Sequence, residues 1–140
     1  MIMKNTPHRL WCPLSRGALG LLFVYAGAIK LLDLPRFTRH VGDFGIVFDS
    51  LVNLVAITLC VTELTLGVGL LVNVRGALPA IVGLLLFFIG VLVYGIAIGL
   101  DIECGCWGTE FGMTLGTQLT TDLGLLGWCS LIHWSCQKCK

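Results

Sequence analysis

Residues 77–100 read ALPAIVGLLLFFIGVLVYGIAIGL and contain no charged side chain. A helix that crosses a membrane needs about 20 predominantly apolar residues, because the hydrocarbon core of a bilayer is about 30 Å thick. This stretch is long enough to cross and too apolar for the surface of a soluble domain. It therefore predicts a transmembrane helix.

The composition of the whole chain agrees with a membrane protein. Of the 140 residues, 56% are hydrophobic and 12% are charged, whereas about 25% of residues are charged in a usual soluble domain. So few charges cannot cover a surface that faces water, but a surface that faces lipid needs none. The net charge is +1, and no Lys/Arg run indicates nucleic-acid binding. We expect membrane lipid to surround the protein.

Three further apolar stretches lie at residues 14–32, 51–74 and 117–134. With residues 77–100 they predict four crossings, and the short connections make neighbouring helices antiparallel. We therefore predict an all-α, four-helix transmembrane bundle that forms one domain over residues 1–140. Residues 34–48, in the longest connection, have apolar anchors among polar residues and are expected to lie at the membrane interface.

Lys and Arg are distributed unevenly over the two sides of this bundle. One side holds Lys4, Arg9, Arg16, Arg75, Lys138 and Lys140. The other side holds Lys30, Arg36 and Arg39, and the connection at residues 101–116 holds no Lys or Arg. Because cytoplasmic loops are enriched in Lys and Arg, we expect both termini in the cytoplasm of a bacterium. Residues 101–116 then face the periplasm from the inner (cytoplasmic) membrane.

Glycine occurs 18 times. Small residues let helix backbones approach each other in lipid. We expect such contacts within one bundle at four pairs: Gly67 with Gly69, Gly83 with Gly90, Gly95 with Gly99, and Gly124 with Gly127.

Residues 101–108, DIECGCWG, carry the strongest chemical signal. Cys104 and Cys106 are separated by one glycine, which permits the backbone of a small disulfide ring. A strained disulfide is more easily reduced than a relaxed one, although Asp101 and Glu103 disfavour the thiolate. Three interpretations stay open for this pair: redox exchange, a structural disulfide and a soft-metal site.

Five other cysteines lie elsewhere in the chain. Cys136 and Cys139 have the Cys-x-x-Cys spacing of redox and metal sites, in what we expect to be a frayed C-terminal tail on the side of Cys12. Cys60 and Cys129 fall inside helices, where a cysteine usually behaves as a small apolar residue. We regard these four helix and tail thiols as secondary candidates for redox chemistry: Cys60, Cys129, Cys136 and Cys139.

Glu63 lies near the middle of the stretch at residues 51–74. A charge at that depth costs about 2.5–3.5 kcal/mol on insertion scales, so a partner or a function is expected. Lys30 and Asp122 are the candidate partners, and we predict that all three are interior polar residues. We also expect polar residues of the same helix to face the bundle interior: Asn53, Thr58, Thr62 and Thr65. The polar residues that open the last stretch, Asp122 among them, are expected at the membrane interface.

Several of these segments resemble the MauE branch of the DoxX-like membrane proteins. The resemblance covers about residues 14–134. It includes GLLFVYAGAIKLLD at residues 20–33, Glu63-Leu64 followed by Gly67, the Cys-Gly-Cys-Trp-Gly motif at residues 104–108, and Asp122-Leu123.

This resemblance implies a four-helix membrane protein that handles disulfides in the periplasm with a thioredoxin-like partner, for the maturation of a client protein such as methylamine dehydrogenase. Cys104 and Cys106 would then exchange disulfides with that partner, and the electrons would pass to a quinone or to the inner thiols. Cys12, Cys136 and Cys139 depart from the family pattern. Two other functions remain alternatives: an accessory subunit in a larger membrane complex, and a soft-metal transporter.

Overall fold

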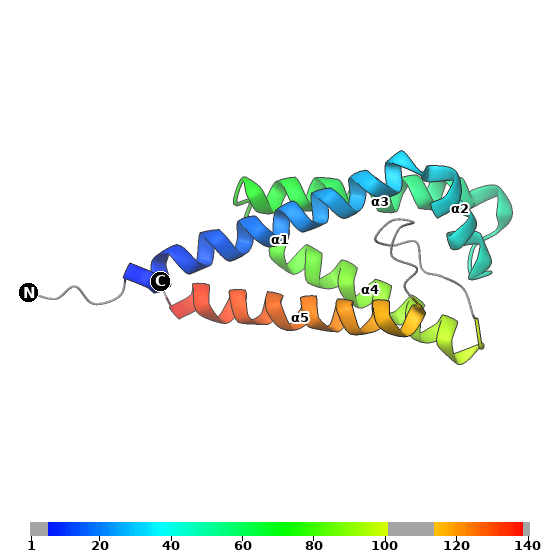
Figure 1. Ribbon diagram of the computed structural model, residues 1–140. Helices are drawn as coiled ribbons and strands as arrows, with labels where there is room; N and C mark the ends of the chain where they lie inside the picture. The colour runs from blue at the N-terminus through cyan, green and yellow to red at the C-terminus, as the bar shows by residue number, and fades with distance from the viewer. Residues whose placement is uncertain (1–5, 101–113, 139–140) are drawn as a thin grey trace, which may run out of the picture.

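The computed structural model describes residues 6–100 and 114–138 and is all-helical over them. The helices are α1 (Thr6–Leu32), α2 (Leu34–Asp43), α3 (Asp49–Leu71), α4 (Ala77–Ala97) and α5 (Leu115–Lys138) (Figure 1). The predicted all-α class is confirmed. The four apolar stretches correspond to α1, α3, α4 and α5, with ends that shift by up to several residues.

Three of the described helices are long and apolar enough to cross a membrane, namely α1 from Trp11 onward, α3 and α4. Three helices of this kind in a chain of 140 residues indicate a membrane protein. Helix α5 has a similar length, but polar residues occupy its first turns and reduce its apolar character. A fourth crossing by α5 therefore stays a prediction.

The long helices form two pairs, α1 with α3 and α4 with α5 (Figure 1). Helix α1 begins and α5 ends at one end of the molecule, and α2 lies at the opposite end (Figure 1). The turn between α3 and α4 belongs to the end of the termini, because Arg75 and Gly76 line the same cavity as Arg16 of α1 and His133 of α5. We call these the terminal end and the α2 end.

Residues 34–48 form a short amphipathic helix and the turn that follows it. Pro35 lies in the first turn of α2, where its missing N–H removes no hydrogen bond. Phe37 is buried against Ala56 and Cys60 of α3, whereas Arg36 and Arg39 are exposed. The predicted apolar anchoring of this segment thus takes the form of one helix packed on α3.

Close helix contact depends on glycines that only partly match those expected. A Cβ atom on Gly67 would lie 2.8 Å from the backbone nitrogen of Val24, and one on Gly20 would lie 2.9 Å from the carbonyl oxygen of Gly67. Gly27 is similarly close to the backbone of α3. The expectation was wrong for five glycines whose Cβ positions meet only open space, Gly99 after the end of α4 and four within α4 and α5: Gly83, Gly90, Gly124 and Gly127. Their faces of α4 and α5 do not contact another described helix.

The main apolar core lies where α1, α4 and α5 meet, and α3 adds Leu70 to it. Leu19, Ile81 and Ile132 are at most 1% exposed and belong to one cluster of buried side chains. This core occupies the part of the bundle nearer the terminal end. Farther along the bundle, the core contains charged side chains instead.

Candidate functional site

A buried ion pair joins α1 to α3. The Nζ atom of Lys30 lies 2.5 Å from Oε1 of Glu63, and the two residues are 4% and 2% exposed. Of the two expected partners of Glu63, the structure therefore selects Lys30. In a low-dielectric interior a lone charge is costly, and its partner offsets much of that cost.

The Lys30 ammonium also lies over two aromatic rings. Its Nζ atom is 5.5 Å from the ring centroid of Phe37 in α2 and 5.2 Å from that of Phe88 in α4. A cation within about 6 Å of a ring centroid is attracted by the negative ring face. These contacts hold the ammonium inside the bundle, and with Glu63 included, three helices other than its own (α2, α3 and α4) contribute to its surroundings.

Helix α5 adds two more polar side chains to this region. Gln118 and Asp122 are 3% and 4% exposed, and Nε2 of Gln118 donates a 3.0 Å hydrogen bond to Oδ1 of Asp122. Both residues line one small cavity together with Lys30 and Glu63. Asp122, which we predicted to be an interior polar residue, is thus buried inside the bundle. It shares the inward face of α5 with Leu115, Leu125 and Cys129.

We call Lys30, Glu63, Gln118 and Asp122 the polar cluster. The cavity that they enclose has a volume of about 20 Å³, and its other lining residues are apolar. Two buried oxygen atoms in it, Oε2 of Glu63 and Oε1 of Gln118, have no hydrogen-bond partner among the described residues. Sequence reasoning missed Gln118, although its spacing of four residues from Asp122 places both on one helix face.

The polar stripe expected on α3 does not face the interior. Asn53, Thr58 and Thr65 are exposed. The hydroxyl groups of Thr58, Thr62 and Thr65 donate to backbone carbonyl oxygens four residues earlier in the same helix. These bonds satisfy the hydroxyls on a lipid-facing surface, while the inward face of α3 carries Cys60, Glu63 and Gly67.

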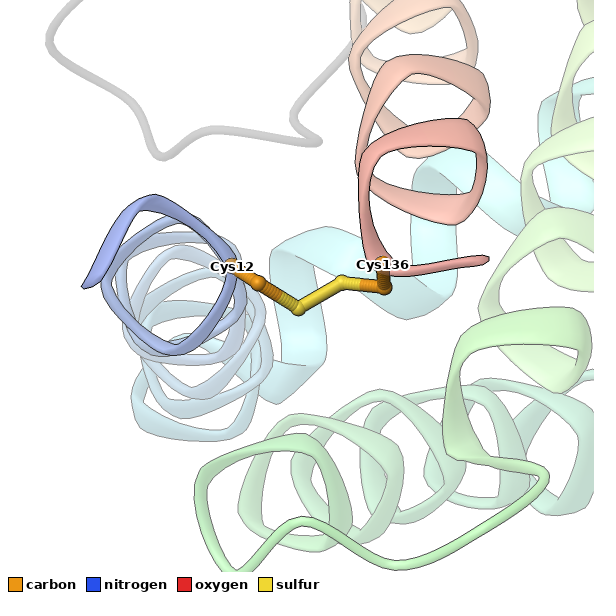
Figure 2. The surroundings of a disulfide bond; sticks show 2 residues. All are labelled: Cys12 and Cys136. Atoms are coloured by element: carbon orange, nitrogen blue, oxygen red, sulfur yellow. A yellow bond between two sulfur atoms is a disulfide. The ribbon is translucent and has the colours of Figure 1, made fainter. Parts of the chain in front are cut away.

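A disulfide joins Cys12 of α1 to Cys136 of α5 at the terminal end (Figure 2). The two Cα atoms are 5.7 Å apart, and the residues are separated by 124 positions in the sequence. The expectation of a frayed tail was wrong at Cys136, because α5 continues to Lys138. In this state Cys136 is bonded to Cys12; Cys139 lies outside the described residues.

Cys60 and Cys129 are free thiols, each 0% exposed. Cys60 packs under α2 with Phe37 and Ala56, whereas Cys129 belongs to the main apolar core. The two thiols thus lie in separate clusters. Within residues 6–100 and 114–138, no group of three or more His, Cys, Asp or Glu side chains is placed to hold a metal ion.

Cys104 and Cys106 fall within residues 101–113, outside the described part of the chain. Helix α4 ends at Ala97 and α5 begins at Leu115, both toward the α2 end (Figure 1). The connection that carries Cys104 and Cys106 therefore starts and finishes at the end opposite Cys12 and Cys136.

An apolar groove lies beneath α2, between α3 and α4. It has a volume of about 100 Å³, and the rings of Phe37, Phe44 and Phe88 contribute to its walls. His40 is the one polar residue among the described residues that line it. The groove adjoins the polar cluster, because Phe88 lines both cavities.

Membrane-length helices around a buried ion pair define a small helical membrane protein with a charged interior. Comparison with known families identifies which one. The sequence matches the family "Methylamine utilisation protein MauE" over residues 9–135, and the chain belongs to that family. The resemblance that its motifs indicated is thereby confirmed.

One curated relative is the methylamine utilization protein MauE of Paracoccus denitrificans. It is 37% identical over 105 residues, which cover 72% of this chain and 55% of the relative. The chain thus spans about half the length of that relative. No solved structure matches the chain.

Proposed function

We propose that this protein is a thiol–disulfide redox protein of the bacterial cytoplasmic membrane. In this proposal Cys104 and Cys106 exchange disulfides with a thioredoxin-like protein in the periplasm and thereby support the maturation of a client protein. Membership of the MauE family supports a role connected with methylamine utilisation.

The observation that carries the proposal is the position of the Cys-Gly-Cys motif in the chain. It lies in the connection between α4 and α5, whose flanking helix ends are at the α2 end. The terminal end carries Arg16 and Arg75, as the cytoplasmic side of a membrane protein usually does. With α5 as a fourth crossing, the motif then faces the periplasm, where oxidised thiols persist.

The exchange proceeds by two thiolate attacks. A thiolate of the partner attacks one sulfur of a Cys104–Cys106 disulfide, which forms a mixed disulfide and releases the other cysteine as a thiolate. The partner's second thiolate then attacks the mixed disulfide, so the partner leaves oxidised and Cys104 and Cys106 leave as a dithiol. Two electrons have moved to this protein, and reoxidation requires a two-electron acceptor. A membrane quinone is our candidate, and the apolar, aromatic groove beneath α2 is a suitable environment for its ring.

Trapping of the mixed disulfide tests this proposal. A reduced thioredoxin whose second active-site cysteine is replaced by serine is incubated with the purified protein in detergent. Its remaining thiolate can form a mixed disulfide but cannot resolve it, and the adducts are separated on non-reducing gels. We expect an adduct with wild type and with Cys60→Ser and Cys129→Ser, whose thiols are buried. The double variant Cys104→Ser/Cys106→Ser is expected to give none.

Equal adduct formation by the double variant would overturn the proposal. A stoichiometric membrane partner that is lost from the double variant, while thiol redox states stay unchanged, would instead identify an accessory subunit.

A further inference from the structure

The hydrogen bonds within the polar cluster leave two of its oxygen acceptors without a donor among the described residues. Lys30 donates to Oε1 of Glu63, and Gln118 donates to Oδ1 of Asp122. Oε2 of Glu63 and Oε1 of Gln118 are buried without a hydrogen-bond partner in the part of the chain described. Both residues are more than nine-tenths buried and line one cavity. Because unpaired buried acceptors are costly, the site requires additional donors.

The charges of the cluster are also unbalanced when its three ionisable groups are charged. Lys30 carries one positive charge, whereas Glu63 and Asp122 each carry a negative charge. Helix α4 contributes only Leu85 and Phe88 to the lining, and the lining residues of α1 besides Lys30 are Leu22, Phe23 and Ala26. The described lining thus supplies no second cation. A net negative charge in apolar surroundings is strongly disfavoured, and one bound proton would remove it.

We infer that the polar cluster is an intramembrane binding site for one exchangeable proton and one water molecule. The proton converts one carboxylate into a carboxylic acid, and no electron is transferred. It resides mainly on Asp122, since Glu63 is ionised in its pair with Lys30 while the described hydrogen-bond donor to Asp122 is the neutral amide of Gln118. The two carboxyl groups interact, so they titrate as a pair rather than as independent sites.

One water molecule satisfies the remaining hydrogen-bonding groups. It accepts from the Asp122 carboxylic acid and donates to Oε2 of Glu63 and to Oε1 of Gln118. The cavity of about 20 Å³ exceeds the roughly 10–15 Å³ that a buried water needs, and a water with three partners is typical of such sites. The same hydrogen bonds connect α5 to the ion pair between α1 and α3.

Infrared spectroscopy of the protein in lipid nanodiscs at neutral pH tests this inference. The carbonyl stretching band of a protonated carboxylic acid should be present in wild type and should shift in D₂O. Asp122→Asn and Glu63→Gln should each abolish it, because either change leaves one carboxylate to balance Lys30. Lys30→Met should roughly double it, because both carboxyl groups then need a proton.

Asp49→Asn is the matched control, since this exposed residue at the start of α3 should leave the band unchanged. Absence of the band from wild type, or its persistence in Asp122→Asn, would overturn the inference. The two amide variants preserve side-chain size, so the test does not depend on whether Lys30→Met folds. Cys104 and Cys106 do not enter it, and its outcome is therefore independent of the thiol proposal.

Discussion

Helix α1 is joined to its two neighbours in different ways. Against α3 it packs backbone to backbone through Gly20, Gly27 and Gly67, and the Lys30–Glu63 pair is buried in the same seam. Against α5 it makes far fewer contacts, and the Cys12–Cys136 disulfide links the two helices at the terminal end. The first seam thus depends on close packing along its length, whereas the second depends on a covalent bond at one end.

The difference teaches how helices associate where the hydrophobic effect does not drive them together. In lipid, small residues allow close van der Waals contact and polar side chains add hydrogen bonds. The α1–α3 seam uses both. The α1–α5 seam has the disulfide at one end and the cavity of the polar cluster farther along, so we expect it to open first.

Gly67→Val should cause the largest loss, because a Cβ atom there would lie within 3 Å of the α1 backbone. Overpacking commonly costs about 1–3 kcal/mol, and we expect about 3 kcal/mol or more here since backbone atoms cannot move aside. Unfolding in mixed micelles of increasing SDS content measures the change. Gly83→Val on the open face of α4 is the matched control, and equal losses in both variants would contradict the description of the seam.

Lys30→Met should cost less, about 2–3 kcal/mol. Removal of one partner of a buried ion pair typically costs 3–5 kcal/mol, but proton uptake by Glu63 and Asp122 limits the charge left behind. The same SDS titration applies. A greater loss of stability than that of Gly67→Val would show that the ion pair contributes more than close packing to the α1–α3 seam.

Cys12→Ser/Cys136→Ser should reduce stability by about 1–2 kcal/mol. A disulfide that closes a long loop contributes about 2–4 kcal/mol or more in soluble proteins, because it restricts the unfolded chain. Helices in a membrane are already restricted when the bundle is unfolded, so the disulfide contributes less. Dithiothreitol should destabilise wild type to the same extent and leave this variant unchanged. An equal effect of dithiothreitol on both would assign the loss to other thiols.

The redox state of Cys12 and Cys136 in intact cells tests the proposed orientation. The cytoplasm keeps thiols reduced, so with both termini inside we expect Cys12 and Cys136 to react with a membrane-permeant maleimide in intact cells. Cys104 and Cys106 should be accessible to an impermeant maleimide after reduction from outside. A Cys12–Cys136 bond that remains fully oxidised in growing cells would contradict a cytoplasmic terminal end.

Thr58→Val should have the smallest effect, within about 0.5 kcal/mol, as is usual for surface substitutions. The Thr58 hydroxyl is exposed and bonds only within α3, on a face away from the α1–α3 seam. The SDS titration should not distinguish this variant from wild type. A loss comparable to that of Lys30→Met would place Thr58 in an interface.

The sequence predicted the all-α class and the apolar stretches because length and hydropathy depend on local residues alone. It also predicted that Glu63 is buried, since a charge in a long apolar run has few alternatives. The inward position of Gln118 depends on the phase of α5, which a run of polar residues obscured. The same uncertainty about helical phase made the prediction of an inward-facing polar stripe on α3 wrong.

Contacts between residues far apart in the sequence could not be predicted from local patterns. Cys12 and Cys136 are separated by 124 positions, and nothing local specifies that α1 and α5 end side by side. The glycine contacts could not be predicted for the same reason. Gly67 contacts Gly20 and Val24 of α1, whereas Gly83 and Gly90 of α4 have only open space beside them. Which small residues form a seam is decided by the partner helix.

The Cys12–Cys136 bond converts most of the polypeptide into a macrocycle. Any single protease cut between these two residues, for example in the connection between α4 and α5, leaves one covalently continuous molecule that differs from wild type by one opened peptide bond. On a gel such a nicked protein migrates as one band until a reductant separates it into two fragments. A chain cut in the connection between α4 and α5 therefore stays in one piece only while the Cys12–Cys136 bond at the far end is intact.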